Sequence, residues 1–156
     1  MELAIFPSNK IFIFFNFRSF SILNNSLDEI KYSLEIKKKF SVSAELIYDA
    51  WLDPNAIKEF MRPADVITIP SPEVESKVGG RFTFNMHAGE NVLPHKGEYK
   101  ILDRPKKIQF TWNSMNTNNE DSLVTITINP IDDNSCELTL VHEQLPNEES
   151  RNNHDA

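Results

Sequence analysis

The chain has 156 residues, of which 40% are hydrophobic and 25% are charged, and its formal net charge is −7. This size and composition are typical of one globular domain with a single core, and the acidic balance disfavours nucleic acid as a partner, because contacts to phosphate need concentrated lysine and arginine. The single cysteine, Cys136, excludes an intramolecular disulfide and a thiolate metal cluster, and it fits a reducing cytoplasm.

Residues 1–27 have a different composition from the rest of the chain. Six of the eleven phenylalanines lie in the first twenty positions. The apolar run from Ile11 to Phe17 is too short for a bilayer span, which needs about 20 residues, and it lacks the basic start and cleavage site of a secretory signal. A membrane-touching segment, an added strand and upstream sequence translated from a misplaced start all remain open. We favour the third and predict that the domain occupies residues 28–156.

The first predicted elements are one strand and two short helices. Residues 32–40 alternate between apolar and polar side chains, which predicts a strand with one buried face. Ser43 is a suitable N-cap for a helix that follows, and Asp53-Pro54 ends that helix and opens another. The inward side chains are expected to be Leu46, Ile47, Ala50 and Trp51 on the first helix, and Ile57, Phe60 and Met61 on the second.

The remainder of the chain predicts an antiparallel meander. Gly79-Gly80 allows a sharp bend, a loop is expected around Gly89 and Pro94, and a long polar loop spans residues 113–121. The predicted strands are 66–69, 73–78, 82–86, 97–101, 108–112, 124–128 and 136–142.

After His142 the chain turns acidic, and Pro146 with Glu148-Glu149 predicts the start of a helix. A curved sheet with one apolar face needs a cover for that face, but only about two turns precede Ala156. We therefore expect the covering helix to be incomplete. Residues 1–27, a second copy in a homodimer, or chain that continues beyond this sequence are the candidates for the missing cover.

Five short motifs, taken together, resemble the family named for activators of the heat-shock-protein-90 ATPase, within the superfamily of START domains and birch-pollen allergens. They are residues 49–54 (DAWLDP), 78–82 (VGGRF), 97–99 (GEY), 108–112 (IQFTW) and 139–143 (TLVHE). The resemblance extends from Tyr32 to Ala156 and implies an α+β helix-grip fold. In that fold a curved antiparallel sheet wraps a long C-terminal helix, two short helices follow the first strand, and an apolar ligand occupies a cavity between helix and sheet. Phe60-Met61 stand where family members often carry two tryptophans.

The candidate ligand site follows from the inward rows and from this resemblance. Tyr99, Trp112 and His142 would supply polar groups to an otherwise apolar lining. Ordinary core packing is the alternative interpretation for each residue. The candidate lining residues are Trp51, Phe60, Phe84, Met86, Tyr99, Trp112 and His142.

The sequence names no catalytic residue, no metal ligands and no cofactor. His142 beside Glu143 permits a general acid/base role, although a core histidine with a hydrogen-bond partner explains it as well. The histidines lack metal-ligand spacing, and Cys136 is expected to be a buried, inert thiol. Three functions remain as hypotheses. The first is binding of a small apolar ligand, the second is stimulation of a heat-shock chaperone's ATPase, and the third is a cyclase or hydrolase activity known from the wider superfamily.

Overall fold

The computed structural model describes residues 3–6, 10–13, 20–21, 32–60 and 66–147. The strands are β1 (Leu3–Phe6), β2 (Lys10–Ile13), β3 (Phe20–Ser21), β4 (Tyr32–Phe40), β5 (Ile67–Thr68), β6 (Glu73–Val74), β7 (Arg81–Ala88), β8 (Asn91–Asp103), β9 (Lys107–Trp112), β10 (Ser122–Asp132) and β11 (Ser135–Leu145). The helices are α1 (Ala44–Ala50), α2 (Pro54–Phe60) and a 3-10 turn, η1 (Met115–Thr117).

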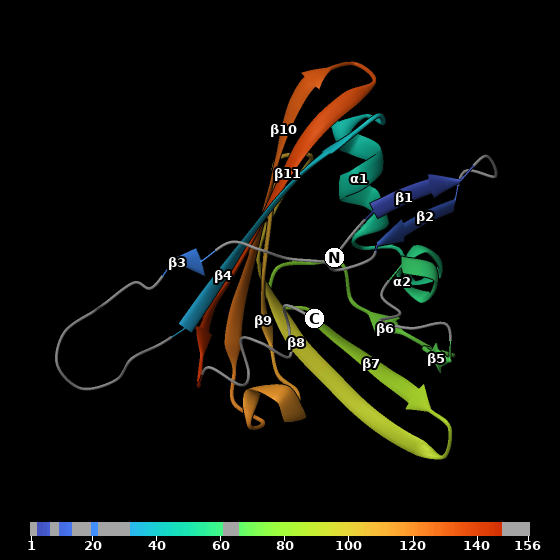
Figure 1. Ribbon diagram of the computed structural model, residues 1–156, viewed down its shortest axis with the longest axis vertical. Helices are drawn as coiled ribbons and strands as arrows, with labels where there is room; N and C mark the ends of the chain where they lie inside the picture. The colour runs from blue at the N-terminus through green and yellow to red at the C-terminus, as the bar shows by residue number, and fades with distance from the viewer. Residues whose placement is uncertain (1–2, 7–9, 14–19, 22–31, 61–65, 148–156) are drawn as a thin grey trace, which may run out of the picture.

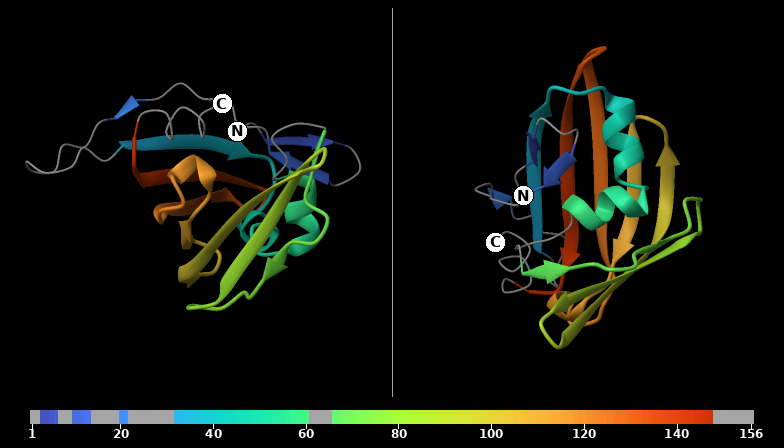
Figure 2. Two further views of the ribbon diagram at one scale, coloured as in Figure 1. Left: turned by 90° about the horizontal axis from the view of Figure 1, so that it is seen from below. Right: turned by 90° about the vertical axis from the view of Figure 1, so that its right-hand side faces the viewer.

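Nine of the described strands form one sheet, in the order β3-β4-β11-β10-β9-β8-β7-β5, with β6 also paired to β7. Every pairing is antiparallel. The sheet bends strongly, so that β7 passes beneath the two helices (Figure 1 and Figure 2). The α+β class, the curved antiparallel sheet and the two short helices after the first long strand are confirmed.

Two predictions concern the ends of the chain: that the domain starts at residue 28, and that a helix begins near its C-terminal end. Strands β1 and β2 form a separate hairpin, with β2 beside α2, and β3 pairs with Ser33 and Leu34 of β4. The start of the domain at residue 28 stays a prediction. The expected C-terminal helix falls mostly on residues 148–156, which lie outside the described residues, and Pro146 and Asn147 form a bend after β11.

The face of the sheet that carries α1 and α2, called here the inner face, holds the core. Rows of buried side chains cross it because antiparallel register places residues of the same face opposite one another. One row runs over five strands and consists of Leu34, His142, Val124, Phe110 and Tyr99. The next consists of Ile36, Leu140, Ile126, Ile108 and Leu102.

Helix α1 begins as predicted, but it presents a different stripe to the core. The Ser43 hydroxyl accepts a hydrogen bond from the Leu46 amide at 3.3 Å, as an N-cap does. Leu46 is 50% exposed, whereas Tyr48 is only 3% exposed, so the prediction was wrong for Leu46. The buried stripe is Ala44, Ile47, Tyr48 and Trp51, which has the i, i+3, i+4, i+7 spacing of one helix face.

Helix α2 also follows its predicted start, with Pro54 in the first turn and the Asp53 carboxylate accepting from the Asn55 amide at 2.9 Å. Ile57 and Phe60 are buried as predicted. Met61 lies outside the described residues.

The largest difference from the predicted meander is in β8, which begins at Asn91 rather than at Gly97. A tight turn at Gly89, whose φ of +64° suits glycine, leads directly from β7 into β8. Pro94 is tolerated within β8 because β7 is the only strand that pairs with β8 at this point, so the missing N–H falls on an edge. Strands β5 and β6 are shorter than predicted, with two residues each.

A register shift between Tyr99 and Ile101 changes which side chains of β8 face the core. Tyr99 lies opposite Phe110, but Ile101 lies opposite Gln109 and Leu102 lies opposite Ile108. Leu102, not Ile101 as expected from simple alternation, therefore packs on the core.

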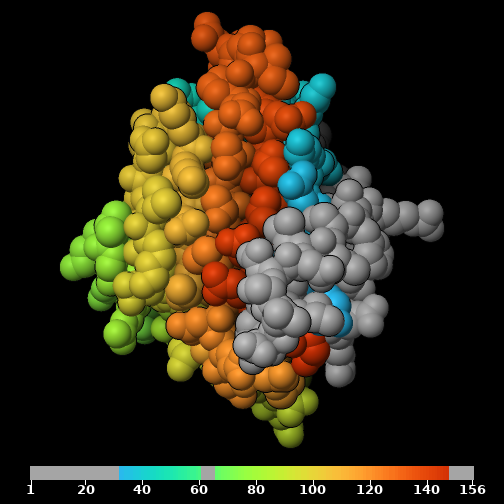
Figure 3. All heavy atoms as spheres, turned by 90° about the vertical axis from the view of Figure 1, so that its left-hand side faces the viewer, coloured from blue at the N-terminus to red at the C-terminus, as the bar shows by residue number. Residues whose placement is uncertain are grey.

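The outer face of the sheet is mainly polar. Figure 3 views this face, on which β8 and β9, β10 and β11, and β4 lie side by side. Along the strands, outward-facing threonines and lysines alternate with the buried, inward-facing residues. Examples are the half-buried Thr125, Thr127 and Thr139.

An ion pair ties α1 to the turn between β8 and β9. Both Asp49 carboxylate oxygens accept hydrogen bonds from the Arg104 guanidinium, each at 2.8 Å. These bonds lower the pKa of the Asp49 carboxyl. The contact fixes one end of α1 over the inner face.

Candidate functional site

Five aromatic side chains from β7, β8 and β9 gather on the inner face, and this group is called the aromatic end. Its members are Phe82, Phe84, Tyr99, Phe110 and Trp112. Phe82 is the central ring, with centroids 4.9 Å from Phe84, 5.4 Å from Tyr99, 5.4 Å from Phe110 and 6.0 Å from Trp112. These separations are those of stacked and edge-to-face aromatic pairs.

Glycines allow this cluster to form. Phe82 lies opposite Gly97 in the β7–β8 pair, and a Cβ on Gly97 would collide with the Phe82 ring and with the Thr111 carbonyl oxygen. The backbone of Tyr99 is held by two hydrogen bonds, from the Gly79 amide to its carbonyl at 2.8 Å and from its own amide to the Gly80 carbonyl at 2.9 Å. Gly79 has a φ of +80°, which confirms the predicted bend.

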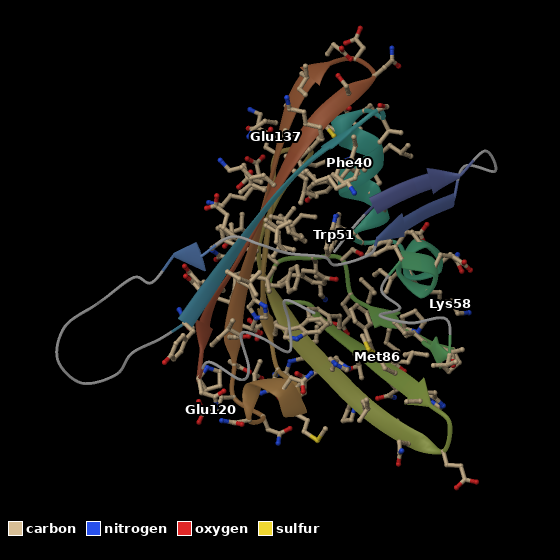
Figure 4. All side chains as sticks on the ribbon, in the orientation of Figure 1. Phe40, Trp51, Lys58, Met86, Glu120 and Glu137 are labelled. Atoms are coloured by element: carbon tan, nitrogen blue, oxygen red, sulfur yellow. The ribbon has the colours of Figure 1, made fainter. Side chains whose placement is uncertain are left out.

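The seven residues predicted to line a ligand site are all buried, but they do not form one group. Phe84, Tyr99 and Trp112 belong to the aromatic end. Trp51 and Phe60 form a separate pair on the two helices, with ring centroids 5.2 Å apart. Figure 4 shows Trp51 between α1 and the sheet and Met86 on β7, which continues the row of Phe82 and Phe84.

Two buried side-chain donors in this region have no hydrogen-bond partner among the described residues. They are the indole N–H groups of Trp51 and Trp112, whose side chains are 5% and 8% exposed. The Ser114 hydroxyl, two residues after Trp112, is also buried without a partner. Buried polar groups are usually paired, so each of these atoms requires an explanation.

His142 lies four strands from β7 and contacts the aromatic end through Ser122. The Ser122 hydroxyl is 2.7 Å from the Trp112 carbonyl oxygen and 2.7 Å from Nε2 of His142, and both side chains are buried. Because a carbonyl oxygen only accepts, Ser122 donates its proton to Trp112 and accepts one from the His142 Nε2–H. A serine nucleophile needs the opposite polarity, with its hydroxyl donating to the histidine. The histidine therefore orders this buried serine rather than activating it.

His95 and Ser122 belong to this region but were not predicted as site residues. The His95 ring lies 5.2 Å from the Trp112 ring, and its Nδ1–H donates to the Leu93 carbonyl oxygen at 2.9 Å. The alternation of inward and outward residues along a strand could have identified both as inward-facing. His95 stands two and four residues before the inward positions 97 and 99, and Ser122 stands two residues before the inward Val124.

The family model described as "Activator of Hsp90 ATPase homolog 1-like protein" matches residues 41–156. The chain belongs to this family. No curated protein matches the chain in sequence.

Solved structures share the family's fold. A protein from Chromobacterium violaceum is 24% identical with a TM-score of 0.64, over 73% of this chain and 80% of that one. An HSP90 activator from Plasmodium falciparum is 27% identical with a TM-score of 0.58, over 73% of this chain and 74% of that one. A protein from Rhodobacter sphaeroides is 16% identical with a TM-score of 0.67, over 77% of each chain.

The inner face of this family member is almost free of formal charge. Of the inward positions on β4 to β11 that are not exposed, only Lys38 has a formally charged side chain, and it is half-buried on β4 opposite Leu138. Burial raises the pKa of the Tyr99 hydroxyl, so that group is neutral at physiological pH. The aromatic end therefore offers apolar surface and neutral hydrogen-bonding groups.

Two further findings concern metal-binding groups and membrane-spanning helices. In the described ranges, no group of three or more His, Cys, Asp or Glu side chains is arranged to hold a metal ion. Nor do the helices of those ranges include one with the length and apolar character needed to cross a membrane.

Proposed function

We propose that this domain binds a small apolar molecule against the aromatic end of the inner face. The observation that supports the proposal is the unpartnered indole N–H of Trp112 inside a cluster of four other aromatic rings. A buried donor without a partner costs about 1–3 kcal/mol. A phenylalanine at this position would fill the core without that cost. A ligand-binding surface explains the tryptophan, since such surfaces combine apolar walls with a few polar groups.

The proposal is tested by titrating the full chain with N-phenyl-1-naphthylamine, an uncharged dye that fluoresces in apolar surroundings. We expect saturable binding of one dye per chain. Phe84→Leu removes one ring of the aromatic end while keeping an apolar side chain, and it should weaken binding about three- to tenfold, the range of one aromatic contact.

Val141→Ala is the matched control, because Val141 is half-buried on the outer face of the sheet, on β11, four strands from the Phe84 strand β7. Its affinity for the dye should equal that of the wild type. A folded wild-type protein without saturable binding would overturn the proposal, and so would equal effects of the two substitutions.

A second candidate function is stimulation of the Hsp90 ATPase. It is supported by the family and by the 27% identity to the Plasmodium falciparum HSP90 activator. The test adds the full chain to purified Hsp90 and measures ATP turnover. Stimulation that saturates with the concentration of the added chain supports this function, and unchanged turnover removes it.

A further inference from the structure

We infer that the ligand is uncharged and carries a hydrogen-bond acceptor, such as a carbonyl or ether oxygen, which the indole N–H of Trp112 binds. This inference rests on the proposed function and adds the chemical class of the ligand. It starts from one atom, Nε1 of Trp112, in a side chain that is 8% exposed and has no hydrogen-bond partner.

An indole nitrogen in a protein only donates, so only an acceptor can pair with it. None of the polar groups at this end described above pairs with this N–H. The Trp112 carbonyl accepts from Ser122, the Ser122 hydroxyl accepts from His142, and Nδ1–H of His95 donates to Leu93. The other neighbours of the Trp112 indole are the rings of Phe82, Phe84 and Phe110. An acceptor brought by the ligand would satisfy this donor.

The charge of the inner face then decides between a neutral and an anionic acceptor. A carboxylate also accepts hydrogen bonds, but its burial needs a cation or several donors to offset the lost hydration. Lys38, the one formally charged side chain at an inward, non-exposed position of β4 to β11, lies on β4, and β11 and β10 separate that strand from the Trp112 strand β9. A neutral oxygen needs no counter-ion, which favours a ketone, ester, amide or ether over an acid.

A buried water molecule is the alternative partner for this N–H. The two cases differ in their selectivity among ligands. If water satisfies the indole, an oxygen on the ligand loses its hydration without a new hydrogen bond, so the ketone binds no more tightly than a hydrocarbon of equal size. If the ligand satisfies it, the oxygen strengthens binding.

The test compares three probes of similar size by their displacement of N-phenyl-1-naphthylamine from the full chain. They are 2-acetylnaphthalene, which has a carbonyl acceptor, 2-ethylnaphthalene, which has none, and 2-naphthoate, which is anionic at pH 7. We expect the ketone to bind about three- to tenfold more tightly than the hydrocarbon, the range of one neutral hydrogen bond. Naphthoate should bind less tightly than the ketone.

Two variants separate the hydrogen bond from the apolar contact. Trp112→Phe removes the donor and should reduce the ketone-to-hydrocarbon ratio to about one. Phe84→Leu removes an aromatic ring without a donor, so it should weaken both probes and leave the ratio unchanged.

A spectroscopic measurement tests the wild type directly. The chain has two tryptophans, so a ¹H–¹⁵N spectrum contains two indole signals, which Trp51→Phe assigns. The Trp112 indole proton should shift downfield when the ketone binds and should shift much less when the hydrocarbon binds.

The inference is overturned if the ketone binds the wild type no more tightly than the hydrocarbon, if naphthoate binds most tightly, or if the Trp112 signal responds equally to both neutral probes. In each of those cases the dye still binds, so the proposed function stands. If neither the dye nor any probe binds the folded protein, the proposed function fails together with the inference.

Discussion

The inner face has two ends that differ in chemistry although they share one sheet. The aliphatic end comprises Leu34 and Ile36 on β4, Ile126 and Ile128 on β10, and Leu138 and Leu140 on β11, all at most 4% exposed. Helix α1 packs against β10 and β11 there. The aromatic end, on β7 to β9, combines its rings with the buried indole N–H of Trp112, which has no partner among the described residues.

If the proposed function holds, this difference separates stability from recognition. Aliphatic side chains leave no polar atom to satisfy, so burial at the aliphatic end contributes only to folding, at about 25 cal/mol per Å² of apolar surface. At the aromatic end, the unpartnered indole reduces part of that gain. Substitutions at the aliphatic end should therefore change stability and not affinity, whereas those at the aromatic end should change both.

The largest effect is expected from truncation at the aliphatic end. Ile126 is fully buried, and Ile126→Ala should lower the free energy of unfolding by about 2–5 kcal/mol, because it removes apolar contacts and leaves a cavity. Urea unfolding followed by circular dichroism measures this change. Ile126→Val, which removes one methylene group, should cost about 0.5–1.5 kcal/mol. Dye affinity of the folded variants should equal that of the wild type, and a clear loss of affinity would break the distinction between the two ends.

A smaller effect is expected at the polar contact between the ends. Ser122→Ala removes two buried hydrogen bonds. The His142 Nε2–H loses its acceptor, and the Trp112 carbonyl oxygen loses its donor. We expect a loss of about 1–3 kcal/mol in the free energy of unfolding.

Ser76→Ala is the matched control for that substitution. The Ser76 hydroxyl donates to the Leu52 carbonyl at 3.4 Å, but this contact is exposed to water. Its loss should change the free energy of unfolding by less than about 0.5 kcal/mol. Equal effects of the two serine substitutions would show that the buried contact contributes nothing beyond a surface bond.

The smallest effect is expected at the ion pair outside both ends. Asp49→Asn should lower the Tm at pH 7 by about 1–3 °C, because an exposed pair contributes little. The folded-state pKa of Asp49 lies below its ordinary value of 3.8, so its contribution is full above that value and is lost as the pH falls through the lower, folded pKa.

Thermal melts at several pH values measure this effect. The Tm difference between wild type and Asp49→Asn should be constant from pH 7 to about pH 5, shrink below about pH 4, and also shrink in high salt. Glu90→Gln, at the exposed β7–β8 turn, is the control and should leave the Tm unchanged. A difference that grows on acidification would contradict the assignment.

The sequence predicted those parts of the fold that local patterns determine. Strand β4 agrees at both ends with its predicted range, and Ser43 caps α1 as expected. The buried stripe of α1 differs from the predicted one, because it includes Tyr48 and leaves out Leu46. Several apolar residues are adjacent in this helix, and packing against the sheet determines which of them are buried. Strand β8 was predicted too short because Pro94 normally interrupts a strand, and only the strand order shows that this part of β8 has a free edge.

The candidate site was predicted less completely than the fold. Burial of the seven candidate residues followed from alternation on the strands and from helical spacing for Trp51 and Phe60, but their division into a helix pair, an aromatic end and the distant His142 depends on tertiary packing and on register between strands. The hydrogen bond between Ser122 and His142 joins residues twenty positions apart on neighbouring strands, and no local pattern indicates it. The partners of buried polar atoms are set by tertiary packing, which one sequence does not specify.

The register shift at Lys100 divides β8 into two halves that obey opposite parities. Residues 95, 97 and 99 face the aromatic end, whereas Leu102 reaches the aliphatic row from an even-numbered position. Without this one extra residue, Tyr99 would still lie opposite Phe110 and Leu102 opposite Ile108, so the whole strand would alternate regularly and the local bend of the bulge would be lost. A relative without the bulge would have one residue fewer between these two positions. Comparisons of this hairpin among relatives should therefore match residues by the side of the sheet they occupy, because counting along the chain would equate an inner-face residue with a solvent-facing one.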